Sequence, residues 1–380
     1  MQVLMPQRVF ISVAEASADQ HAGNLARALQ KRVPNIQIEG LGGTAMREAG
    51  VVVHHDTVGN AAMGLRAILR ASEVSKLLKW TARHFDERAF DLHICCDSWS
   101  MNHHFATLAK SRNIPVLYYI APQTWASREG RVKKLAGCID ALACILPFEE
   151  PYFRSHDVPA TFVGHPLFDA LPRDRPITPA AQRFPHRPPV IGVLPGSRAS
   201  VASANFPRLL KVMEILHRAF PDAQFLIPTT AATHDIVADW VAAASWIEFA
   251  RDAFDDLIPQ CDLCLTVSGT AALHVAAYNV PMVVVYQGNP VLWHLVGRWV
   301  VKARTYSLVN ILSGKSEKIV PEFIPWYGSV KPVARYVIDL LNHPERLEET
   351  RQELARMIAP LDKAGASNNA AKLAISLMKH

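Results

Sequence analysis

Short apolar runs recur along the first half of the chain and alternate with longer amphipathic stretches. Apolar runs of this kind predict strands that are buried on both faces, as in a parallel sheet. The expected strands are Val9–Val13, Ile36–Leu41, Leu92–Cys96, Val116–Ile120, Ala141–Leu146 and Ala160–Val163. Between the first two, Leu25, Ala28 and Leu29 share one face of a predicted helix, His21–Arg32. Strands alternating with helices predict an α/β fold in which helices cover both faces of a parallel sheet.

The same pattern restarts after Leu171–Pro189, a stretch rich in Pro and Arg that is typical of a linker. Its expected strands are Val190–Leu194, Gln224–Pro228 and two within Cys261–Tyr286, and its helices are Phe206–Phe220, Pro344–Ile358 and Ala364–Lys379. We therefore expect two Rossmann-like domains, residues 1–170 and 190–358, with a linker at 171–189 and the helical segment 359–380 joined to the first domain. In such open sheets, ligands bind outside the carboxyl ends of the strands.

Two strand ends in the second half carry turns suited to an anion. Ser268-Gly269-Thr270 stands between a strand and a helix, where free backbone N–H groups and the helix dipole favour negative charge. Gly196-Ser197 ends another strand, and the following Arg198 can fork two oxygens of a diphosphate or be an ordinary surface arginine. Two such ends together indicate a pyrophosphate, as in a nucleotide-sugar. His274 lies one helical turn beyond Thr270 and is either a ribose partner or a core histidine.

Asp97 follows the strand Leu92–Cys96 directly. A carboxylate at this edge can accept a proton from an attacking hydroxyl, although an Asp that caps the next helix is equally common. Asn102 could orient this carboxylate or an acceptor. The first strand leads into Ala14–Asp19 and not into G-x-G-x-x-G, which disfavours an NAD-dependent dehydrogenase.

Composition fits a globular α/β enzyme, with 50% hydrophobic and 19% charged residues. The net charge of +6 suits anionic partners such as a nucleotide, a phosphorylated substrate or a membrane face. Nucleic acid is not expected, because the chain lacks a Lys/Arg run and a known nucleic-acid-binding motif. The six cysteines stand in apolar settings and predict buried, reduced thiols in a cytoplasmic protein, with Cys261 and Cys264 on opposite faces of a strand. Neither a signal peptide nor a run of about 18 apolar residues is recognisable.

Two stretches combine basic residues with Leu and Trp. Met63–Phe85 contains Leu77 and Trp80 beside Lys76 and Lys79, and Val291–Arg304 has the same character. A helix of this kind can lie in a bilayer interface, or it can be an ordinary surface helix with its apolar face in the core.

The ordered set of motifs resembles the lipid-A-disaccharide synthase family, inverting glycosyltransferases with the two-Rossmann GT-B fold. The match runs nearly end to end. It comprises Glu15-Ala16-Ser17 with Asp19; Gly42-Gly43 with Met46; Met63-Gly64; Asp97 with Asn102; Pro122 and Trp125 followed by Arg131-Val132; Val163-Gly164-His165-Pro166; Leu194–Arg198; Ser268–Ala271; Asn310-Ile311; and Val320–Ile324.

The resemblance implies transfer from UDP-2,3-diacylglucosamine to 2,3-diacylglucosamine 1-phosphate, giving the β-1,6-linked lipid A disaccharide and UDP without a metal or other cofactor. Asp97 would remove the proton of the acceptor hydroxyl. The implied donor site comprises Gly196, Ser197, Arg198, Ser268, Gly269, Thr270, His274, Asn310 and Glu322, and the acceptor side comprises Glu15, Ser17, Asp19, Asn102 and Trp125. The basic apolar stretches would dock the acyl chains and hold the enzyme on the cytoplasmic face of the inner membrane. A homodimer is a further expectation.

This chain also departs from the family pattern. Ala14 and Ala18 replace glycines, Ala67 and His274 replace glutamates, Val201 stands where a glutamate is usual, and Pro325 replaces a glutamine. If the two glycines adopt positive φ, alanine is strained there. Lost polar groups leave two other functions open: a non-catalytic or substrate-altered descendant that binds a UDP-sugar or lipid, and a UDP-sugar 2-epimerase of the same fold.

Overall fold

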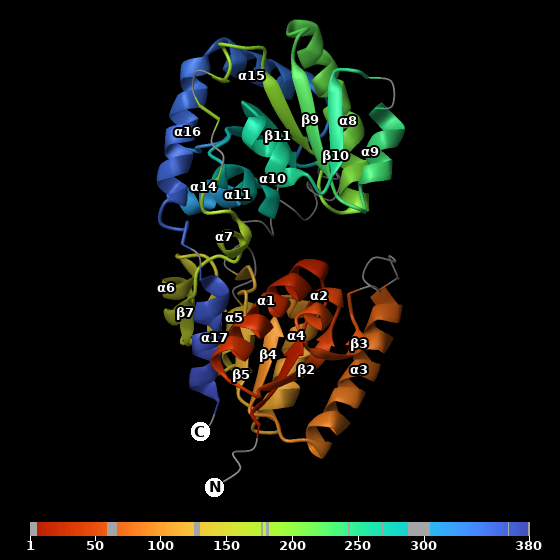
Figure 1. Cartoon of the computed structure of the whole chain (residues 1–380), viewed down its shortest axis with the longest axis vertical. Coiled ribbons are helices and arrows are strands. Elements are labelled where there is room, and N and C mark those ends of the chain that lie inside the picture. The colour runs from red at the N-terminus through yellow and green to blue at the C-terminus, as the bar shows by residue number, and fades with distance from the viewer. Residues whose placement is uncertain are drawn as a thin grey trace. The chain divides into compact units, whose positions relative to one another are not determined.

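A computed structural model describes residues 6–58, 67–124, 130–175, 178–179, 182–241, 244–267, 269–287, 305–363 and 365–378. The chain forms two compact units, Met1–Ala170 with Lys363–His380, and Leu171–Asp362 (Figure 1). Within the ranges just given, no helix combines the length and the apolar character needed to cross a membrane.

The first unit is built on a seven-stranded parallel sheet with the order β3-β2-β1-β4-β5-β6-β7. Its strands are β1 Arg8–Ser12, β2 Gln37–Gly42, β3 Val52–Asp56, β4 Leu92–Cys96, β5 Val116–Tyr119, β6 Ala141–Cys144 and β7 Ala160–Phe162. The strand order reverses between β1 and β4, which are adjacent. In an open sheet of this topology, the crevice at the carboxyl ends of those two strands is where a ligand binds.

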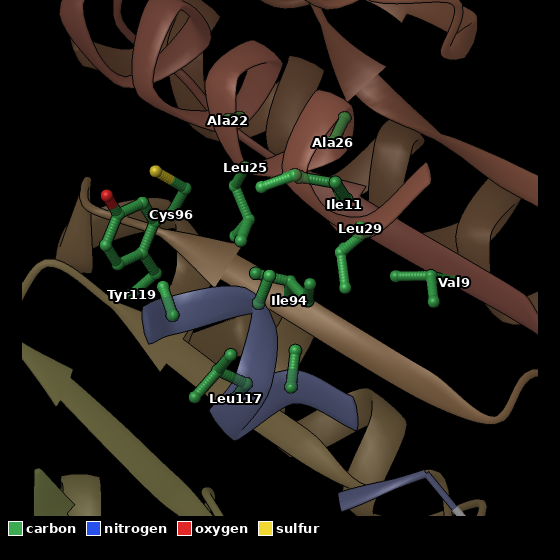
Figure 2. Close-up of a cluster of buried hydrophobic side chains, with 14 of the residues drawn as sticks. Val9, Ile11, Ala22, Leu25, Ala26, Leu29, Ile94, Cys96, Leu117 and Tyr119 are labelled. Carbon is green, nitrogen blue, oxygen red and sulfur yellow. The ribbon is translucent and has the colours of Figure 1, made fainter. Parts of the chain in front are cut away.

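Alternating side chains of these strands supply two buried layers. Val9, Ile11 and Ile94 face helices α1 (Ala16–Arg32), α2 (Thr44–Glu48) and α17 (Ala366–Leu377). Figure 2 shows Leu25 and Leu29 of α1 pointing toward Ile94. Phe10 and Cys95 face the opposite layer, formed by α3 (Ala67–Glu87), α4 (Trp99–Lys110), α5 (Gly130–Ala136) and α6 (Glu149–Arg154). Covering both faces of the sheet explains why its strands are continuous apolar runs.

The described apolar residues of helix α3 pack into the second of these buried layers, the one around Phe10. Leu77, Leu78 and Trp80 pack against the cluster around Phe10, while Lys76 and Lys79 are exposed. Over this part of the helix, the packing supports the interpretation as an ordinary surface helix with its apolar face in the core. Residues 59–66 and the side chains of residues 67–71, which belong to the same predicted stretch, lie outside the description.

The C-terminal helix α17 is attached to the first unit by the short helix α7 (Leu167–Ala170) and the motif before it. The carboxylate of Asp169 accepts hydrogen bonds from the backbone N–H groups of Gly365, Ala366 and Ser367. A Cβ on Gly164, whose φ is +98°, would lie 3.5 Å from Ala366. The Val163–Pro166 motif thus provides a docking surface for α17, which packs against α1 and β5.

The second unit has a six-stranded parallel sheet with the order β10-β9-β8-β11-β12-β13. Its strands are β8 Val190–Leu194, β9 Gln224–Thr229, β10 Ile247–Arg251, β11 Leu263–Val267, β12 Met282–Val285 and β13 Glu322–Phe323. The helices are α8 Ala199–Ala219, α9 His234–Val241, α10 Phe254–Leu257, α11 Thr270–Ala277, α14 Leu308–Ser313, α15 Lys331–Asn342 and α16 Pro344–Ile358, with a 3₁₀ turn at Ile258–Gln260. Here the order reverses between β8 and β11.

The Pro- and Arg-rich segment 171–189 packs on the second unit where it is described. The buried carboxylate of Asp262 accepts hydrogen bonds from the backbone N–H groups of Phe184 and Val190 and from Arg187 Nη1 (3.1, 2.9 and 2.8 Å). Thr178 Oγ1 donates to the carbonyl of Pro259 at 2.6 Å. These contacts hold the segment beside the start of β8.

Two helices begin earlier than predicted. Helix α1 starts at Ala16 and α8 at Ala199, so both reach back to the carboxyl ends of the preceding strands, and Pro207 lies inside α8. The expectation for the two cysteines was also wrong, because Cys261 precedes β11. A Cβ on Gly192 would lie 2.6 Å from the sulfur of Cys264 and 3.0 Å from that of Cys261. All six cysteines are buried and free, as expected.

The hydrogen bonds of Asp169 predict that this side chain stabilises the start of α17. Asp169→Ala leaves three N–H groups at a helix start without their acceptor, which we expect to cost about 1–2 kcal/mol in the free energy of unfolding. Hydrogen exchange should accelerate first in residues 365–378. Asp222→Ala, at an exposed turn, is the matched control and should change neither quantity. Unchanged exchange in α17 of the Asp169 variant would contradict this account.

Candidate functional site

The candidate residues cluster at the reversal points of the two sheets. In the first unit, the segment after β1 begins with Val13 and Ala14, and Asp97 is the first residue after β4. In the second unit, Pro195–Arg198 follow β8 and Gly269 lies at the start of α11, just after β11. Carboxyl ends of neighbouring parallel strands share one edge, so each unit brings its two candidate segments together.

Asp97 is partly exposed and stands in an unusual backbone conformation. Asp97 and Ser98 have φ values of +51° and +49°, which cost about 1–2 kcal/mol each for residues other than glycine. Its N–H donates to the carbonyl of Tyr119 (2.9 Å), and its own carbonyl accepts from Tyr118 Oη (2.6 Å). Strain that the surroundings hold in place is typical of functional positions. Here it turns the chain between β4 and α4 and leaves the Asp97 side chain at the carboxyl edge.

Asn102 is fully buried and binds backbone, so it does not reach the acceptor. Its Nδ2 donates to the carbonyls of Ser12 (3.2 Å), Cys96 (3.0 Å) and Asp97 (2.8 Å). Its Oδ1 accepts from Ser12 Oγ at 2.8 Å. The expectation that Asn102 orients the Asp97 carboxylate or an acceptor is therefore corrected. Asn102 positions the backbone of Asp97 instead.

His93 completes this buried network. Its Nε2 lies 2.9 Å from Ser12 Oγ, and the single hydroxyl proton already goes to Asn102. His93 is therefore the donor in this contact, as a neutral ring protonated on Nε2. Burial lowers the pKa of His93 to about 3, which keeps the ring uncharged.

The motif after β1 divides into exposed and buried positions. Glu15 and Ser17 are exposed at the start of α1 and can meet a ligand. Asp19 is buried, and its carboxylate accepts from the N–H groups of Gly43 (2.7 Å) and Ala45 (2.8 Å) at the start of α2. The assignment of Asp19 to an acceptor site is corrected, because its oxygens bind the neighbouring turn.

The glycines at 42 and 43 belong to the same arrangement. A Cβ on Gly43 would come within 2.8 Å of an Asp19 oxygen, and a Cβ on Gly42 within 2.3 Å of the Met46 sulfur. The two motifs around Asp19 and Met46 thus form one packed unit. Neither Ala14 nor Ala18 has positive φ, so the expected strain from replacing glycine at these positions does not arise.

The turn after β8 exposes the groups expected to hold a diphosphate. Gly196 has φ +111°, and a Cβ there would lie 2.6 Å from Val201 Cγ1, so glycine is required. Ser197 and Arg198 are exposed, and the carbonyl of Ser197 accepts from Thr230 Oγ1 at 3.1 Å, which braces the turn from the end of β9. Val201 packs on the core, so the position of the usual glutamate is occupied by an apolar contact.

Of the turn at residues 268–270, which precedes α11, the structure describes only Gly269 and the backbone of Thr270. Gly269 has an extended backbone, and a Cβ there would meet no atom within 4 Å, so protein packing does not require glycine at this position. The predicted site residues Ser268 and Trp125 and the stretch Val291–Arg304 lie outside the described residues, as do the side chains of Thr270 and Ala67.

His274 is paired with a carboxylate that the sequence reasoning missed. Its Nε2 lies 2.7 Å from Asp255 Oδ1, and the same oxygen accepts from Tyr278 Oη at 2.8 Å. Phe254 stacks on the ring with centroids 4.0 Å apart. Burial lowers the pKa of His274 below its ordinary value, and the Asp255 charge opposes this effect. The signal available in the sequence was the spacing of His274 on α11 and Tyr278, the residue after the end of that helix, which are one helical turn apart.

Asn310 and Glu322, both assigned to the donor site, bind each other and the main chain. Asn310 Nδ2 donates to Glu322 Oε1 (2.9 Å) and to the carbonyl of Val320 (2.8 Å). The Glu322 side chain is 1% exposed and also accepts from Lys318 and from the N–H group of Ser307. Burial would raise the pKa of Glu322, but these hydrogen bonds outweigh it and hold the pKa below the ordinary value. Neither side chain is available to a donor, so both are positioning residues for α14 and β13.

Comparison with solved structures places this architecture in a known class. The chain resembles S. aureus MnaA with UDP (TM-score 0.64, 12% identity, covering 99% of this chain and 98% of that one). It also resembles UDP-GlcNAc 2-epimerase from Neisseria meningitidis bound to UDP-GlcNAc (0.62, 13%, 98% and 99%). A third similar structure is MurG from Acinetobacter baumannii (0.59, 13%, 98% and 100%). At these identities the likeness establishes the GT-B fold.

Sequence comparison identifies the family. A family model described as lipid-A-disaccharide synthetase matches residues 9–376. Lipid-A-disaccharide synthases of Geobacter metallireducens and Syntrophus aciditrophicus are each 34% identical to this chain, covering 98% of it and 97% and 98% of the relatives. The synthase of Nitrosococcus oceani is 33% identical over 98% of this chain and 96% of its own length. The chain belongs to the lipid-A-disaccharide synthase family and is a hexosyltransferase of lipid A biosynthesis.

The Asn102 network yields a test of how Asp97 is held. Asn102→Asp turns a carboxylate oxygen toward three carbonyl groups, and we expect the free energy of unfolding to fall by about 3 kcal/mol. Asn24→Asp on α1, which places a carboxylate near Arg27, is the matched control and should change it by less than about 0.5 kcal/mol. Chemical denaturation of both variants measures the difference. Equal stabilities would show that the amide does not support the turn at Asp97.

Proposed function

We propose that Asp97 is the general base of transfer from UDP-2,3-diacylglucosamine to the 6-hydroxyl of 2,3-diacylglucosamine 1-phosphate. Its carboxylate takes the hydroxyl proton while the oxygen bonds to the anomeric carbon of the donor. The bond from that carbon to the diphosphate breaks with inversion, and UDP leaves with the electron pair. The single observation that supports this role is the strained, hydrogen-bonded turn that presents Asp97 at the reversal point of the first sheet.

The second unit supplies the groups for the leaving diphosphate. The turn Gly196–Arg198 opens onto the N-terminus of α8, a helix of 21 residues, and Arg198 is exposed beside it. Backbone N–H groups at a helix start and a guanidinium both stabilise negative charge that develops on a leaving phosphate. The N-terminus of α11 adds a second dipole at the adjacent strand end. These groups allow the reaction to proceed without a metal ion.

The nucleoside side of the donor site has its own arrangement. In this proposal Asp255 provides the carboxylate for the ribose hydroxyls, held in place by Tyr278 and by His274. Asp255 is exposed at the carboxyl end of β10, on the edge that carries the two turns. A carboxylate supplied by α10 compensates for the glutamate that His274 replaces.

The substrates also set the place of action. Both sugars carry two acyl chains, so we propose that the enzyme works at the cytoplasmic face of the inner membrane as a peripheral protein. Its net charge of +6 favours an anionic bilayer surface. The described apolar face of α3 lies in the core, so this attraction rests on charge in the described part of the chain.

Removal of the base gives the first functional test. Asp97→Asn keeps the size of the side chain and removes its basicity, so we expect disaccharide formation to fall by at least about 100-fold. Mass spectrometry of the product from both diacylglucosamine substrates measures this loss. UDP affinity should be unchanged, because the groups proposed to hold the diphosphate and the ribose all belong to the second unit.

The same disaccharide assay separates a transferase from a non-catalytic descendant. An active synthase from the family is run alongside to validate the substrates. Wild-type protein that binds UDP-sugar without turnover would indicate a non-catalytic descendant, and full activity of Asp97→Asn would refute the base assignment.

The nucleoside arrangement predicts a binding defect. Asp255→Asn should weaken UDP binding about tenfold, the effect of losing one charged hydrogen bond, while Asp256→Asn at the adjacent exposed position should bind like the wild type. Calorimetric titration with UDP measures both. His274→Glu supplies the carboxylate of the family's usual residue but removes the imidazole that holds Asp255, so it should bind UDP about as tightly as the wild type. Equal affinity of the two Asp variants would remove Asp255 from the site.

A further inference from the structure

A group of metal-binding side chain types lies outside both strand-end sites, under α3 in the first unit. It consists of Glu39 on β2, His54 on β3 and His84 on α3, and we call it the Glu-His-His cluster. Glu39 pairs with Phe10 in the middle of β1, and its side chain is only 8% exposed. A carboxylate inside a sheet is costly unless it is neutralised by strong partners. Its position therefore requires a specific counter-charge.

The three side chains converge on one point. His54 Nε2 lies 2.6 Å and His84 Nε2 3.0 Å from the same oxygen of Glu39, Oε2. One potential ligand atom from each residue lies within 4.8 Å of the other two. Around a four-coordinate zinc ion with bonds of about 2.0–2.1 Å, ligand atoms are about 3.3 Å apart. Small rotations of the side chains would bring these atoms to that spacing.

The surroundings hold the two imidazoles in place. Trp80 stacks on His84 with ring centroids 4.7 Å apart and an angle of 18°, and its ring lies 5.0 Å from that of His54. Since the three ligands come from three different elements of the packed unit, their arrangement is set by the fold. A preformed site of this kind loses little freedom when an ion binds.

The positively charged side chain of Arg88 lies near the Glu39 carboxylate. Arg88 Nη1 is 3.6 Å from Glu39 Oε2, and its side chain is 51% exposed. At that distance it is not a hydrogen bond, and its long stem can turn into solvent. His55, whose ring lies 4.6 Å from that of Trp80, is a further titratable group near the cluster. Arg88 therefore leaves the inner side of the carboxylate to the two imidazoles.

We propose that the Glu-His-His cluster binds a divalent transition-metal ion of the zinc type, which ties α3 to β2 and β3. Two imidazole nitrogens and one carboxylate oxygen form an established zinc ligand set, with the fourth position open to water. Mg²⁺ and Ca²⁺ prefer oxygen ligands and do not suit this set. The ion would take the place of the protons between the two imidazole nitrogens and Glu39 Oε2. Its role is structural, because neither Asp97 nor the turns proposed to hold the diphosphate belong to the cluster.

The full-length chain, treated with a chelator, allows a direct test with Zn²⁺ and Co²⁺ as probes. Wild-type protein should bind one equivalent by calorimetric titration, give the visible absorption of four-coordinate Co²⁺, and melt at a higher temperature with Zn²⁺. His54→Gln keeps a polar side chain at a partly exposed position and should weaken binding by about tenfold or more. His156→Gln, an exposed histidine of the same unit, is the matched control and should bind as the wild type does.

A second measurement avoids substitutions altogether. Crystals of the wild-type protein soaked in Zn²⁺ should give an anomalous diffraction peak between Glu39, His54 and His84. Binding of less than one equivalent by the wild type, equal affinity of His54→Gln and the wild type, or an anomalous peak only at other residues would each overturn the proposal.

Discussion

The first unit depends on one buried amide. Asn102 reaches from α4 to the carbonyl groups of Ser12 at the end of β1 and of Cys96 and Asp97 at the end of β4. These two strands are neighbours at the point where the sheet order reverses, so the amide ties their carboxyl ends together. It donates hydrogen bonds to all three carbonyl groups, and the same bonds hold Asp97 at positive φ. The fold and the proposed chemistry therefore share one set of hydrogen bonds.

In the proposed reaction the second unit has a different task, the neutralisation of a diphosphate. For this task it has a glycine turn, an exposed arginine and the start of a long helix, which all stabilise negative charge. Its buried carboxylates serve structure instead. Asp262 fixes the segment before β8 and Glu322 fixes the start of α14, each through several donors. These two negative charges are therefore neutralised within the unit, by backbone N–H groups and by Arg187 and Lys318.

Ten of the thirteen described strands and their parallel arrangement could be predicted from apolar runs, because burial on both faces dominates there. The strands β3, β10 and β13 were missed, because they lie at sheet edges, are only partly buried and lack a continuous apolar run. Strand-end residues such as Asp97 and Gly196 were also predictable, since position at the carboxyl edge follows from strand limits. The direction of polar side chains could not be predicted. Asp19 and Glu322 point inward because backbone N–H groups at nearby helix starts bind them, and that depends on tertiary packing. Asp255 was missed for the same reason, since its partner His274 is far away in the sequence.

The departures from the family pattern differ in physical effect. Ala14 and Ala18 sit at ordinary φ, and Ala18 fills the core, so these replacements leave the backbone as it is. Val201 exchanges a usual charge for packing beside Gly196 and reduces the negative charge next to the diphosphate turn. His274 binds Asp255 of another element, so this edge of the sheet carries a carboxylate. The exposed Arg198 stands at the same edge, after β8. The proposed nucleotide-sugar site needs both charges, a cation for the diphosphate and a carboxylate for the ribose hydroxyls, and this chain has both despite the replacement at position 274.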